Sequence, residues 1–382
     1  MKSERVAAIV GVAESDLGKT PDKNVLQLQA QAANRALNDS GLSKDDVDAI
    51  FTAGNWAWSP NLMLAEYLGI QPSYTDGTNI GGSSFEVHVS HAVEGIRAGL
   101  FEVALITYGS TPRSGHVKNS QAVPNIPLTE QYEAPFGLPT PVGAYALAAT
   151  RHMHQYGTTS EQLAEVAVAT RKWATMNDNA YMREPITVDD VLNSRWITEP
   201  LHLLDCCLVT DGGGAVIVTS KQVAKKTQKK PVWILGHGET HTHNTIANMP
   251  DLIATGANVS GQKAFEMAGI THEELDVVEI YDSFTITVLL TLEALGFCKP
   301  GEGGDFVSNQ RTAPGGDFPM NTNGGGLSYC HPGMYGIFLL IEATRQLRGE
   351  CEDRQVKNAK LSLVHGTGGV LSSSSTVILG RD

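Results

Sequence analysis

Two glycines and two serines stand where a strand-like segment gives way to a helix, in the stretch DGTNIGGSSFEVHVSHAVEGIRAG that runs from Asp76 to Gly99. Small residues at a helix N-terminus let a reacting group approach the point where backbone N–H groups converge. A nucleophile is expected at such a point, yet the loop Gly81-Gly82-Ser83-Ser84 holds no cysteine. Neither serine has the GxSxG setting of an activated nucleophile, so we interpret both as helix N-caps that accept backbone amide hydrogen bonds.

Three other polar side chains occur where a loop or a strand end could present them to a substrate. Tyr281 ends a strand-like run in VVEIYDSF, where its hydroxyl could exchange a proton with substrate or bond a backbone carbonyl. His331 lies in NTNGGGLSYCHPGMYG, a loop without apolar periodicity, and loops of this kind commonly carry function. His365 follows a strand-like run and precedes GTGG, where it could orient water or a carbonyl, or bond the backbone at the strand end.

Five cysteines occur in the chain, at positions 206, 207, 298, 330 and 351, and they do not have the spacing of a metal-ligand set. Cys330 adjoins His331, but neighbouring side chains on an extended loop point apart, which disfavours a Cys–His dyad. Cys206 and Cys207 in LLDCCLVTD are expected to pack in a buried turn. Because an odd count with an adjacent pair is a poor disulfide framework, we predict no metal site and a reducing, cytoplasmic setting.

Composition excludes several classes of function. The 382 residues exceed one ordinary core, which favours two domains or two fused halves. A net charge of −13 argues against a nucleic-acid partner, because phosphate neutralisation needs a basic surface. We expect no membrane insertion, because no apolar run approaches the roughly 18–20 residues of a membrane helix. The segment MKSERVAAIVGVAES is typical of a first strand and not of a signal peptide.

Strand-like runs alternate with amphipathic segments along most of the chain, a pattern that predicts an α/β fold with buried sheets. The expected helices cover residues 24–40, 84–98, 160–176, 258–268, 285–295 and 334–348. The region of about 111–199 differs, since it is rich in proline, glycine and polar residues before it becomes helical. We expect it to form an inserted loop or cap domain outside the sheet.

Two segments repeat the same local order, which indicates a duplicated architecture. ALNDSGLSKDDVDAIFTAG and FEMAGITHEELDVVEIYDS each follow helix, turn, acidic cap and strand. A glycine-rich loop followed by a helix also recurs, at residues 81–99 and 324–349. The simplest interpretation is an N-terminal half of residues 1–225 and a C-terminal half of residues 226–382, each of βαβ type, with two active-site loops facing each other.

The order of these segments resembles the thiolase superfamily, and specifically its sterol-carrier-protein-type branch, over essentially the whole chain. Four motifs carry the resemblance: the segment from Tyr156 to Ser220, VVEIYDSFTITVLLTLEALGFCKPGEGGDFV, NTNGGGLSYCHPGMYG and LVHGTGGVLSSSS. The resemblance implies a five-layer αβαβα core made of two βαβ-type halves. It also implies that the region of about 111–199 is the loop domain that serves coenzyme A.

Laid on this sequence residue by residue, the family's motifs show which catalytic groups remain. His331 matches the histidine of a GHP-type loop, which in thiolases helps to bind and polarise the thioester oxygen. The nucleophilic cysteine of the family falls on Gly82 or Ser83. The family's HDCF-type motif falls on YDSF, with Tyr281 at the histidine position and Ser283 at the cysteine position.

His365 stands near a further family position, that of an acid/base cysteine in the C-terminal glycine-rich loop, so both catalytic thiols are absent from their expected places. Steroid side-chain aldolases, a branch of the same superfamily, are similar in having a Gly/Ala-rich loop in place of the cysteine and a YD-x-F motif in place of HDCF. This likeness implies a catalytic role for Tyr281 and makes Tyr329 a candidate for their second functional tyrosine, whereas His331 is a departure from them. The pocket for the thioester and its oxyanion would be formed by Gly82, Ser83, Ser84, Asp282, Ser283, Gly325 and Gly368.

We therefore expect a thiolase-fold enzyme that acts on an acyl-CoA thioester and breaks or forms a carbon–carbon bond without a covalent cysteine. A retro-aldol reaction fits, because deprotonating a β-hydroxyl breaks the Cα–Cβ bond and leaves an enolate oxygen to stabilise. Tyr281 would exchange the hydroxyl proton, and His331 with the amides of Ser83 and Ser84 would hold the enolate oxygen. Two alternatives stay open: a CoA-dependent thiolase or acyltransferase, with Cys330 or free coenzyme A as nucleophile, and a non-catalytic acyl-CoA-binding subunit.

The resemblance also implies partners. Thiolases assemble as dimers, and this branch is similar to one that works with a small zinc-ribbon/OB-fold subunit, which would carry the metal. Coenzyme A is expected as part of a substrate or co-substrate, with no covalently bound cofactor. The Met and aromatic content of the region of about 111–199 favours a bulky apolar acyl group, as in steroid or aromatic degradation.

Overall fold

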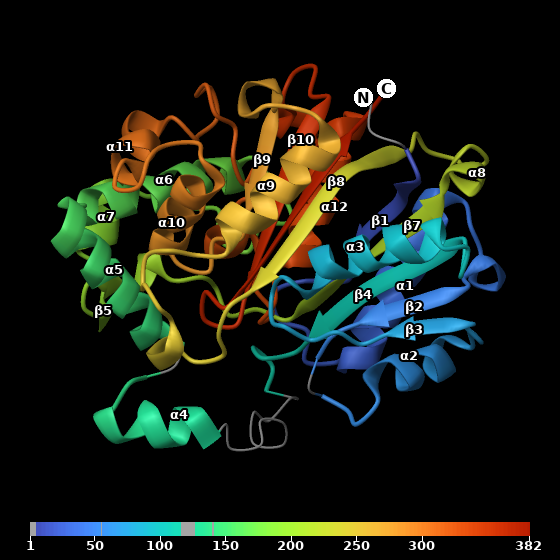
Figure 1. The fold of residues 1–382 in the computed structure, drawn as a ribbon, viewed down its shortest axis with the longest axis horizontal. Helices are drawn as coiled ribbons and strands as arrows, with labels where there is room; N and C mark the ends of the chain where they lie inside the picture. The colour runs from blue at the N-terminus through green and yellow to red at the C-terminus, as the bar shows by residue number, and fades with distance from the viewer. Residues whose placement is uncertain (1–4, 55, 116–126, 140) are drawn as a thin grey trace.

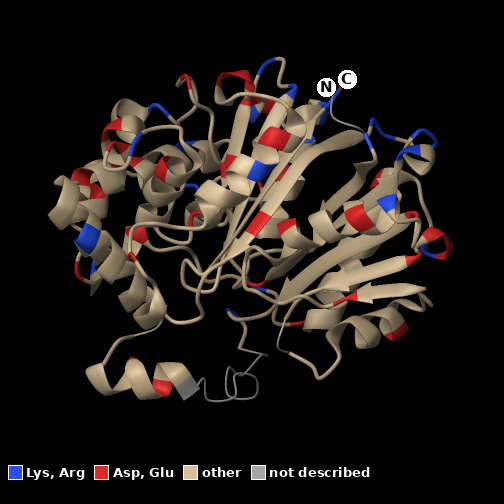
Figure 2. Cartoon of the chain, in the orientation of Figure 1, with Lys and Arg blue, Asp and Glu red and all other residues tan. Residues whose placement is uncertain are grey.

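One nine-stranded sheet runs through the computed structural model, which describes residues 5–54, 56–115, 127–139 and 141–382 (Figure 1). The strands follow the order β3-β2-β4-β7-β1-β8-β11-β10-β9. They are β1 (Ala7–Glu14), β2 (Ala49–Thr52), β3 (Tyr74–Asp76), β4 (Val103–Ser110), β7 (Gly212–Ser220), β8 (Val232–His241), β9 (Val277–Ile280), β10 (Leu361–Gly368) and β11 (Ser373–Gly380). Figure 2 shows that these strands carry few charged residues, as expected for a sheet that is covered on both faces.

The strand order repeats itself across the middle of the sheet. In the N-terminal half, β1–β7 and β7–β4 are antiparallel, and β4–β2 and β2–β3 are parallel. In the C-terminal half, β8, β11, β10 and β9 repeat this series with the same directions, and a parallel bridge from Val278 to Met320 stands where β3 stands in the first half. The halves join where Ala8 and Ile9 of β1 pair with β8. The duplicated α/β halves expected from the sequence are thus present, whereas the boundary at residues 225 and 226 stays a prediction.

Three hydrophobic cores separate the layers of the fold. The principal helices are α1 (Val25–Ser40), α2 (Pro60–Leu68), α3 (Ser84–Arg97), α9 (Ala257–Ala268), α10 (Thr285–Leu295) and α12 (Gly336–Arg348). One core lies between α1, α2 and the outer face of the N-terminal strands. A second surrounds α3 and α12 between the strands of the two halves, and a third lies between the C-terminal strands and the pair α9 and α10. The two halves of the nine-stranded sheet therefore form two separate layers with α3 and α12 between them. From one side of the molecule to the other the layers are helix, sheet, helix, sheet and helix, as in the expected five-layer core.

The two central helices owe their place to their composition. Ten of the fourteen residues of α3 are buried, as are eleven of the thirteen residues of α12. A helix that is buried nearly all round can be covered only by packing partners on every side. α12 ends at Gly349, whose φ of 77° suits glycine. The two helices begin close together, since a Cβ at Gly336, the first residue of α12, would lie 2.4 Å from the carbonyl oxygen of Gly82 in the loop before α3.

The expected cap region is partly described. Its elements are α4 (Pro127–Tyr132), α5 (Val142–Tyr156), α6 (Ser160–Thr175), α7 (Val188–Leu192), β5 (Trp196–Thr198) and β6 (Leu201–His202). β5 and β6 form a separate two-stranded sheet, and α5 and α6 pack into the same core as α9 and α10. Figure 1 shows α4 set apart from α5. Residues 116–126 and 140 of the expected cap lie outside the described residues.

The helix boundaries expected from the sequence agree with the structure to within two residues. α10 covers the expected range, and the largest difference is at α12, which begins at Gly336 and not at residue 334. The remaining short helices are α8 (Lys221–Ala224) and α11 (Gly303–Val307). No helix in the described part of the chain is long and apolar enough to cross a membrane.

Candidate active site

A tyrosine and a histidine from two separate segments meet in one hydrogen bond. Tyr281 follows β9 and donates its backbone N–H to the carbonyl of His365 (3.0 Å), which continues the β9–β10 ladder. Its side chain lies in the core shared by α3 and α12, where it is 5% exposed. There Tyr281 Oη lies 2.7 Å from Nε2 of His331. Two groups that can pass a proton between them are therefore in direct contact.

This Tyr281–His331 dyad is neutral at neutral pH. Burial lowers the pKa of His331 to about 4, against smaller opposing effects of backbone hydrogen bonds that include one with Leu208. Burial also raises the pKa of Tyr281 well above its ordinary value. We therefore assign the bond as the Tyr281 hydroxyl donating to an unprotonated Nε2 of His331. In this state the imidazole can accept the tyrosine proton.

Asp282 fixes the loop that carries the histidine of the dyad. Residues 325–329 form one π-helical turn, and the N–H groups of its second and third residues donate to the Asp282 carboxylate, from Gly326 at 2.6 Å and from Leu327 at 3.1 Å. A Cβ at Gly325 would lie 2.0 Å from Asp282 Oδ2, so this close approach requires glycine. Successive residues of an extended segment point to opposite sides. Asp282 can therefore hold the loop while the preceding tyrosine faces the histidine.

Gly82 lies directly against the Tyr281 ring. A Cβ at Gly82 would lie 1.9 Å from Tyr281 Cε1, 2.8 Å from its Cδ1 and 2.7 Å from the carbonyl oxygen of Thr367. The ring therefore occupies the space that a side chain at position 82 would need. In a close-packed interior, a cysteine at position 82 and a tyrosine at position 281 exclude each other unless the ring moves. The glycine of the loop and the tyrosine at the end of β9 form one structural unit.

The two serines of this loop make local hydrogen bonds, and neither caps α3, so the N-cap interpretation was wrong. Ser83 has helical backbone angles (φ −78°, ψ −1°) in place of the extended ones of a capping residue, and its hydroxyl lies 2.8 Å from Ser373 Oγ. Ser84 Oγ donates to the Gly81 carbonyl (2.6 Å) and accepts the Ile80 N–H (3.0 Å). The Ser84 N–H also donates to the Gly81 carbonyl (3.0 Å). The amides of Ser83 and Ser84 are both expected from the sequence to hold an oxyanion, and of the two only the Ser83 amide is left for that role.

His365 contributes its backbone to the site and not its side chain. Val364 packs in the core of α3 and α12, whereas Leu363 packs in that of α9 and α10. Alternation along β10 places the His365 side chain on the face of Leu363, where Nδ1 lies 2.9 Å from Thr376 Oγ1, which in turn contacts Ser260 of α9 at 3.0 Å. Burial there lowers the pKa of His365 to about 3. The structure therefore does not bring this imidazole to the dyad.

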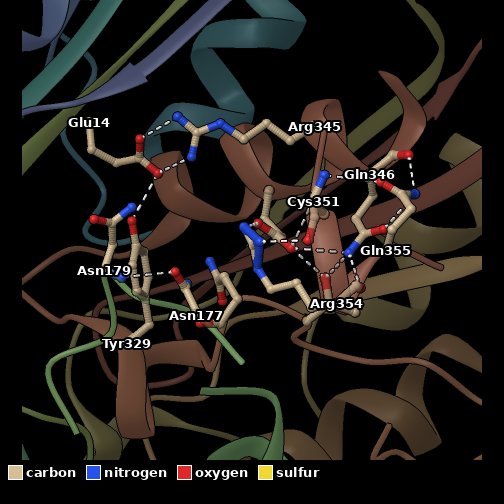
Figure 3. A network of polar contacts seen from close by, with 12 residues as sticks. Glu14, Asn177, Asn179, Tyr329, Arg345, Gln346, Cys351, Arg354 and Gln355 are labelled. Carbon is tan, nitrogen blue, oxygen red and sulfur yellow. Dashed lines mark hydrogen bonds and ion pairs between the residues drawn. The ribbon is translucent and has the colours of Figure 1, made fainter. Parts of the chain in front are cut away.

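Tyr329 and Cys330 are not placed to react with a substrate. Tyr329 Oη donates to Glu14 Oε1 (2.8 Å), and Figure 3 shows this carboxylate between the tyrosine and Arg345, with which it forms a bidentate ion pair. Cys330 is fully buried in the core around α12, and burial raises the pKa of its thiol well above the ordinary value. A protonated and inaccessible thiol is a poor nucleophile. Both side chains are buried in the hydrophobic core that also contains Tyr281.

The other predicted pocket residues lie around the dyad. Ser283 Oγ is hydrogen-bonded to Thr287 Oγ1 (2.9 Å) in the first turn of α10. A Cβ at Gly368 would lie 2.0 Å from the Ile80 carbonyl oxygen and 2.6 Å from Ser83 Oγ. The serine loop and the C-terminal glycine loop are therefore in direct contact, and both contacts depend on the absence of a side chain.

Tyr335 belongs to the site although sequence reasoning did not single it out. Its ring centroid lies 5.7 Å from that of Tyr281 and 6.4 Å from that of His331, on which it stacks. Its hydroxyl donates to Asn323 Oδ1 at 2.8 Å, so the ring is held in place from the far side. An aromatic residue inside the glycine-rich GMYG turn was the signal that could have found it.

Glu86 is a second residue that sequence reasoning missed. It lies one helical turn after Gly82, and its fully buried carboxyl makes no hydrogen bond within the described part of the chain. Cβ atoms at Gly336 and Gly366 would lie 2.4 Å and 2.3 Å from its Oε2, so two glycines leave the room that it fills. Burial raises the pKa of Glu86 to about 8, which makes it a neutral acid at pH 7. The glutamate inside the apolar stretch FEVHVSHAV was the available signal.

Comparisons with known proteins agree on one family. A family profile described as thiolase C-terminal domain-like matches residues 238–381. The chain is 34% identical over 363 residues to a 17-hydroxy-3-oxo-4-pregnene-20-carboxyl-CoA lyase of Mycobacterium tuberculosis, covering 90% of this chain and 92% of that protein. It is also 34% identical over 394 residues to a steroid side-chain-cleaving aldolase of Thermomonospora curvata, covering 98% of each. The solved structure of the Ltp2-ChsH2(DUF35) aldolase matches with a TM-score of 0.90 and 33% identity, over 99% of this chain and 98% of that one.

Proposed function

Because this chain belongs to the thiolase superfamily, in its sterol-carrier-protein-type branch with the steroid side-chain aldolases, we propose that it is an acyl-CoA lyase that cleaves a β-hydroxyacyl-CoA by a retro-aldol reaction. The reaction breaks the Cα–Cβ bond of the thioester and releases a ketone or aldehyde and a shorter acyl-CoA. No covalent bond to the enzyme forms at any step.

The observation that carries this proposal is the contact between Gly82 and the Tyr281 ring. An acyl-enzyme needs a nucleophilic side chain just before or at the start of α3. The 1.9 Å that separates a Cβ at Gly82 from Tyr281 Cε1 leaves no room for one at position 82, and the Ser83 hydroxyl is paired with Ser373 Oγ. The same ring brings an acid/base hydroxyl to that point. Where a thiolase has a nucleophile, this site has an acid/base hydroxyl, which is the group that a retro-aldol reaction requires.

The dyad supplies a path for the hydroxyl proton. When the substrate hydroxyl loses its proton to Tyr281 Oη, the tyrosine's own proton can pass to Nε2 of His331 across the 2.7 Å hydrogen bond. The electron pair of the Cα–Cβ bond moves into the thioester and forms an enolate. Because burial lowers the pKa of His331 to about 4, the imidazolium formed in this step returns its proton readily. Proton transfer of this kind contributes about 10²–10⁴-fold to the rate.

The enolate oxygen needs hydrogen-bond donors where charge develops. The Ser83 N–H, next to the glycine that packs on the tyrosine ring, is the amide of the serine loop that remains for this role, since that of Ser84 is bonded to Gly81. We place the thioester oxygen there and the reacting hydroxyl on the opposite side, at Tyr281. Coenzyme A enters as part of the substrate, with no covalently bound cofactor.

We further propose a bulky apolar acyl group of steroid type, on the strength of the substrates named for the relatives. We also propose a homodimer in the cytoplasm and a small zinc-ribbon/OB-fold partner. A partner subunit is supported by the name of the matched Ltp2-ChsH2(DUF35) complex, and a reducing setting by five cysteines that are all free.

The direct test uses the thioester named for the first relative, 17-hydroxy-3-oxo-4-pregnene-20-carboxyl-CoA. Cleavage next to its hydroxyl should release a 17-ketosteroid and propionyl-CoA, which chromatography with mass spectrometry measures for the protein alone and co-expressed with a DUF35 subunit. Tyr281→Phe should lower kcat by about 10²-fold or more. Tyr67→Phe, at a half-exposed position on α2, is the matched control and should not change it. Cleavage that survives in Tyr281→Phe would remove this residue from the mechanism.

A further inference from the structure

A retro-aldol cleavage leaves an enolate whose α-carbon must receive a proton before the acyl-CoA can leave. The Tyr281–His331 dyad deals with the hydroxyl proton on the β side of the broken bond. A second group, with a proton of its own to give, is therefore required on the α side. This requirement rests on the proposed retro-aldol function.

Burial raises the pKa of Tyr281, and among the ionisable groups whose charge raises it further are Cys207, Tyr145, Tyr108 and Asp282. The protons of two of them are already engaged, since Tyr108 donates to the Pro332 carbonyl (2.7 Å) and Tyr145 to the Gly369 carbonyl (3.3 Å).

Burial raises the pKa of Asp282 to about 7, but its side chain points away from that of the preceding Tyr281, and its two oxygens accept backbone N–H groups of the loop that carries His331. The Cys207 thiol differs from these groups, since it makes no hydrogen bond to any residue that the structure describes. Elimination therefore leaves Cys207 as the neighbour with a proton that is free to move.

Strand pairing explains how this thiol reaches the site from a segment more than seventy residues away. Cys206 and Phe284 form an antiparallel bridge, and the Cys207 N–H donates to the Ser283 carbonyl at 3.0 Å. Residues opposite each other in an antiparallel pair present their side chains on the same face, as do residues two apart along one strand. Cys207, Ser283 and Tyr281 therefore share a face.

The same segment runs on past the histidine of the dyad. The Leu208 N–H donates to the Gly326 carbonyl (2.9 Å), and Thr210 exchanges two bonds with His331, its N–H donating to the His331 carbonyl (3.2 Å) and its Oγ1 accepting the His331 N–H (2.9 Å). Cys207 is thus fixed by backbone bonds to both segments of the dyad. Its position does not depend on flexible side chains.

Exposure agrees with a role toward substrate. Tyr281 is 5% and Ser283 7% exposed, whereas Cys207 and His331 both remain partly exposed. The two segments that carry these residues are therefore partly open on this side of the site. Desolvation by the surrounding protein raises the pKa of Cys207 well above that of a free thiol, so the sulfur carries its proton at neutral pH. It is suited to give a proton and unsuited to act as a nucleophile.

We propose that the Cys207 thiol protonates the α-carbon of the enolate. The Sγ–H bond breaks and a Cα–H bond forms with the enolate electron pair, while the thioester carbonyl is restored. The proton that the dyad took from the substrate hydroxyl then neutralises the thiolate. Atoms and charge balance, because one proton leaves the substrate at oxygen and one returns at carbon, and no oxidant or further co-reactant is needed.

The reverse of this step can be measured without any cleavage substrate. The enzyme, with its DUF35 partner where co-expression supplies one, is incubated with propionyl-CoA in D2O, and α-deuterium is counted by mass spectrometry. Wild-type protein should exchange the α-hydrogens, and Cys207→Ala should lose this exchange by about 10²-fold or more. Cys207→Ser, which keeps the size with a weaker acid, should fall between them. Cys206→Ser, at the neighbour whose thiol donates to the His202 carbonyl, is the control and should exchange normally.

The outcomes separate this inference from the proposed function. Cleavage of the steroid thioester by wild-type protein, with exchange unchanged in both Cys207 variants, would overturn the role of Cys207 and leave the lyase intact. Exchange that depends on Cys207 without any cleavage would support the role of the thiol and count against the retro-aldol substrate. The control for folding is that Cys207→Ser keeps the circular dichroism spectrum of wild-type protein and still binds the DUF35 partner. A loss of α-hydrogen exchange in that variant is then chemical and not a failure to fold.

Discussion

Replacing Gly82 by alanine adds one methyl group at the point where the glycine loop meets the Tyr281 ring. The new Cβ would lie 1.9 Å from Tyr281 Cε1, whereas ordinary van der Waals contact begins near 3.4 Å. The ring would have to retreat by about 1.5 Å, the difference between these two distances. The loop cannot retreat instead, because the same Cβ lies 2.7 Å from the carbonyl oxygen of Thr367 on the neighbouring strand.

The retreat has a functional and a structural consequence. Moving the ring by this amount stretches the 2.7 Å bond between Tyr281 and His331 beyond hydrogen-bonding distance. We expect Gly82→Ala to lower kcat for cleavage by about 10²-fold or more, since a positioned acid/base contributes about 10²–10⁴-fold. Overpacking of this kind should also lower the free energy of unfolding by about 1–3 kcal/mol.

The assay compares kcat and urea unfolding of wild-type protein, Gly82→Ala and Gly77→Ala. Gly77 is the matched control, because a Cβ there would meet its nearest atoms at 3.9 Å and it lies shortly before the same loop. Its substitution should leave kcat unchanged and stability within about 0.5 kcal/mol of wild type. Wild-type kcat in Gly82→Ala would refute the argument that Gly82 and the Tyr281 ring form one unit.

Three further substitutions probe the groups around the dyad. Burial raises the pKa of the Glu86 carboxyl from 4.5 to about 8, so with rising pH the unfolded chain loses this proton before the folded protein does. The free energy of unfolding therefore falls by about 1.4 kcal/mol per pH unit between about pH 5 and pH 8. Glu86→Gln should lack this component when urea unfolding is measured across that range, and equal slopes in both proteins would contradict it. Asp282→Asn keeps one acceptor oxygen and turns the other into an NH2 group that faces a backbone N–H of the loop, so kcat should fall by at least about tenfold with a loss of about 1–3 kcal/mol of stability. An unchanged kcat would show that the loop keeps its geometry without the carboxylate. Tyr329→Phe should keep wild-type kcat and lose about 1.5–3 kcal/mol, the contribution of a hydrogen bond to the charged Glu14, whereas a large fall in kcat would restore Tyr329 as a catalytic residue.

Much of the fold could be predicted because its signals are local. Asn24 and Gln27 form a capping box at the start of α1, and Gly41 ends that helix in the left-handed conformation. Signals of this kind repeat along the chain and set the helix ends. Tyr281 and His331 were found through motif positions, and the structure brings them together although fifty residues separate them.

The errors came from contacts that the local sequence does not encode. Which face of β10 carries His365 depends on the register of its neighbours, and the hydroxyls of Ser83 and Ser84 bond to groups that only the folded loop supplies. Tyr329 is bonded to Glu14, more than three hundred residues away in the sequence. Cys207 lay in an expected buried turn, and its place beside the dyad follows from one antiparallel bridge.

The central claim is that carbon–carbon cleavage proceeds here without an acyl-enzyme. It is tested most directly by following 17-hydroxy-3-oxo-4-pregnene-20-carboxyl-CoA in buffer without free coenzyme A, while intact-protein mass spectrometry records the enzyme. We predict equal amounts of ketosteroid and propionyl-CoA, a rate that added coenzyme A does not raise, and an unchanged protein mass throughout. Cleavage that requires free coenzyme A, or a protein mass raised by one acyl group, would contradict the account.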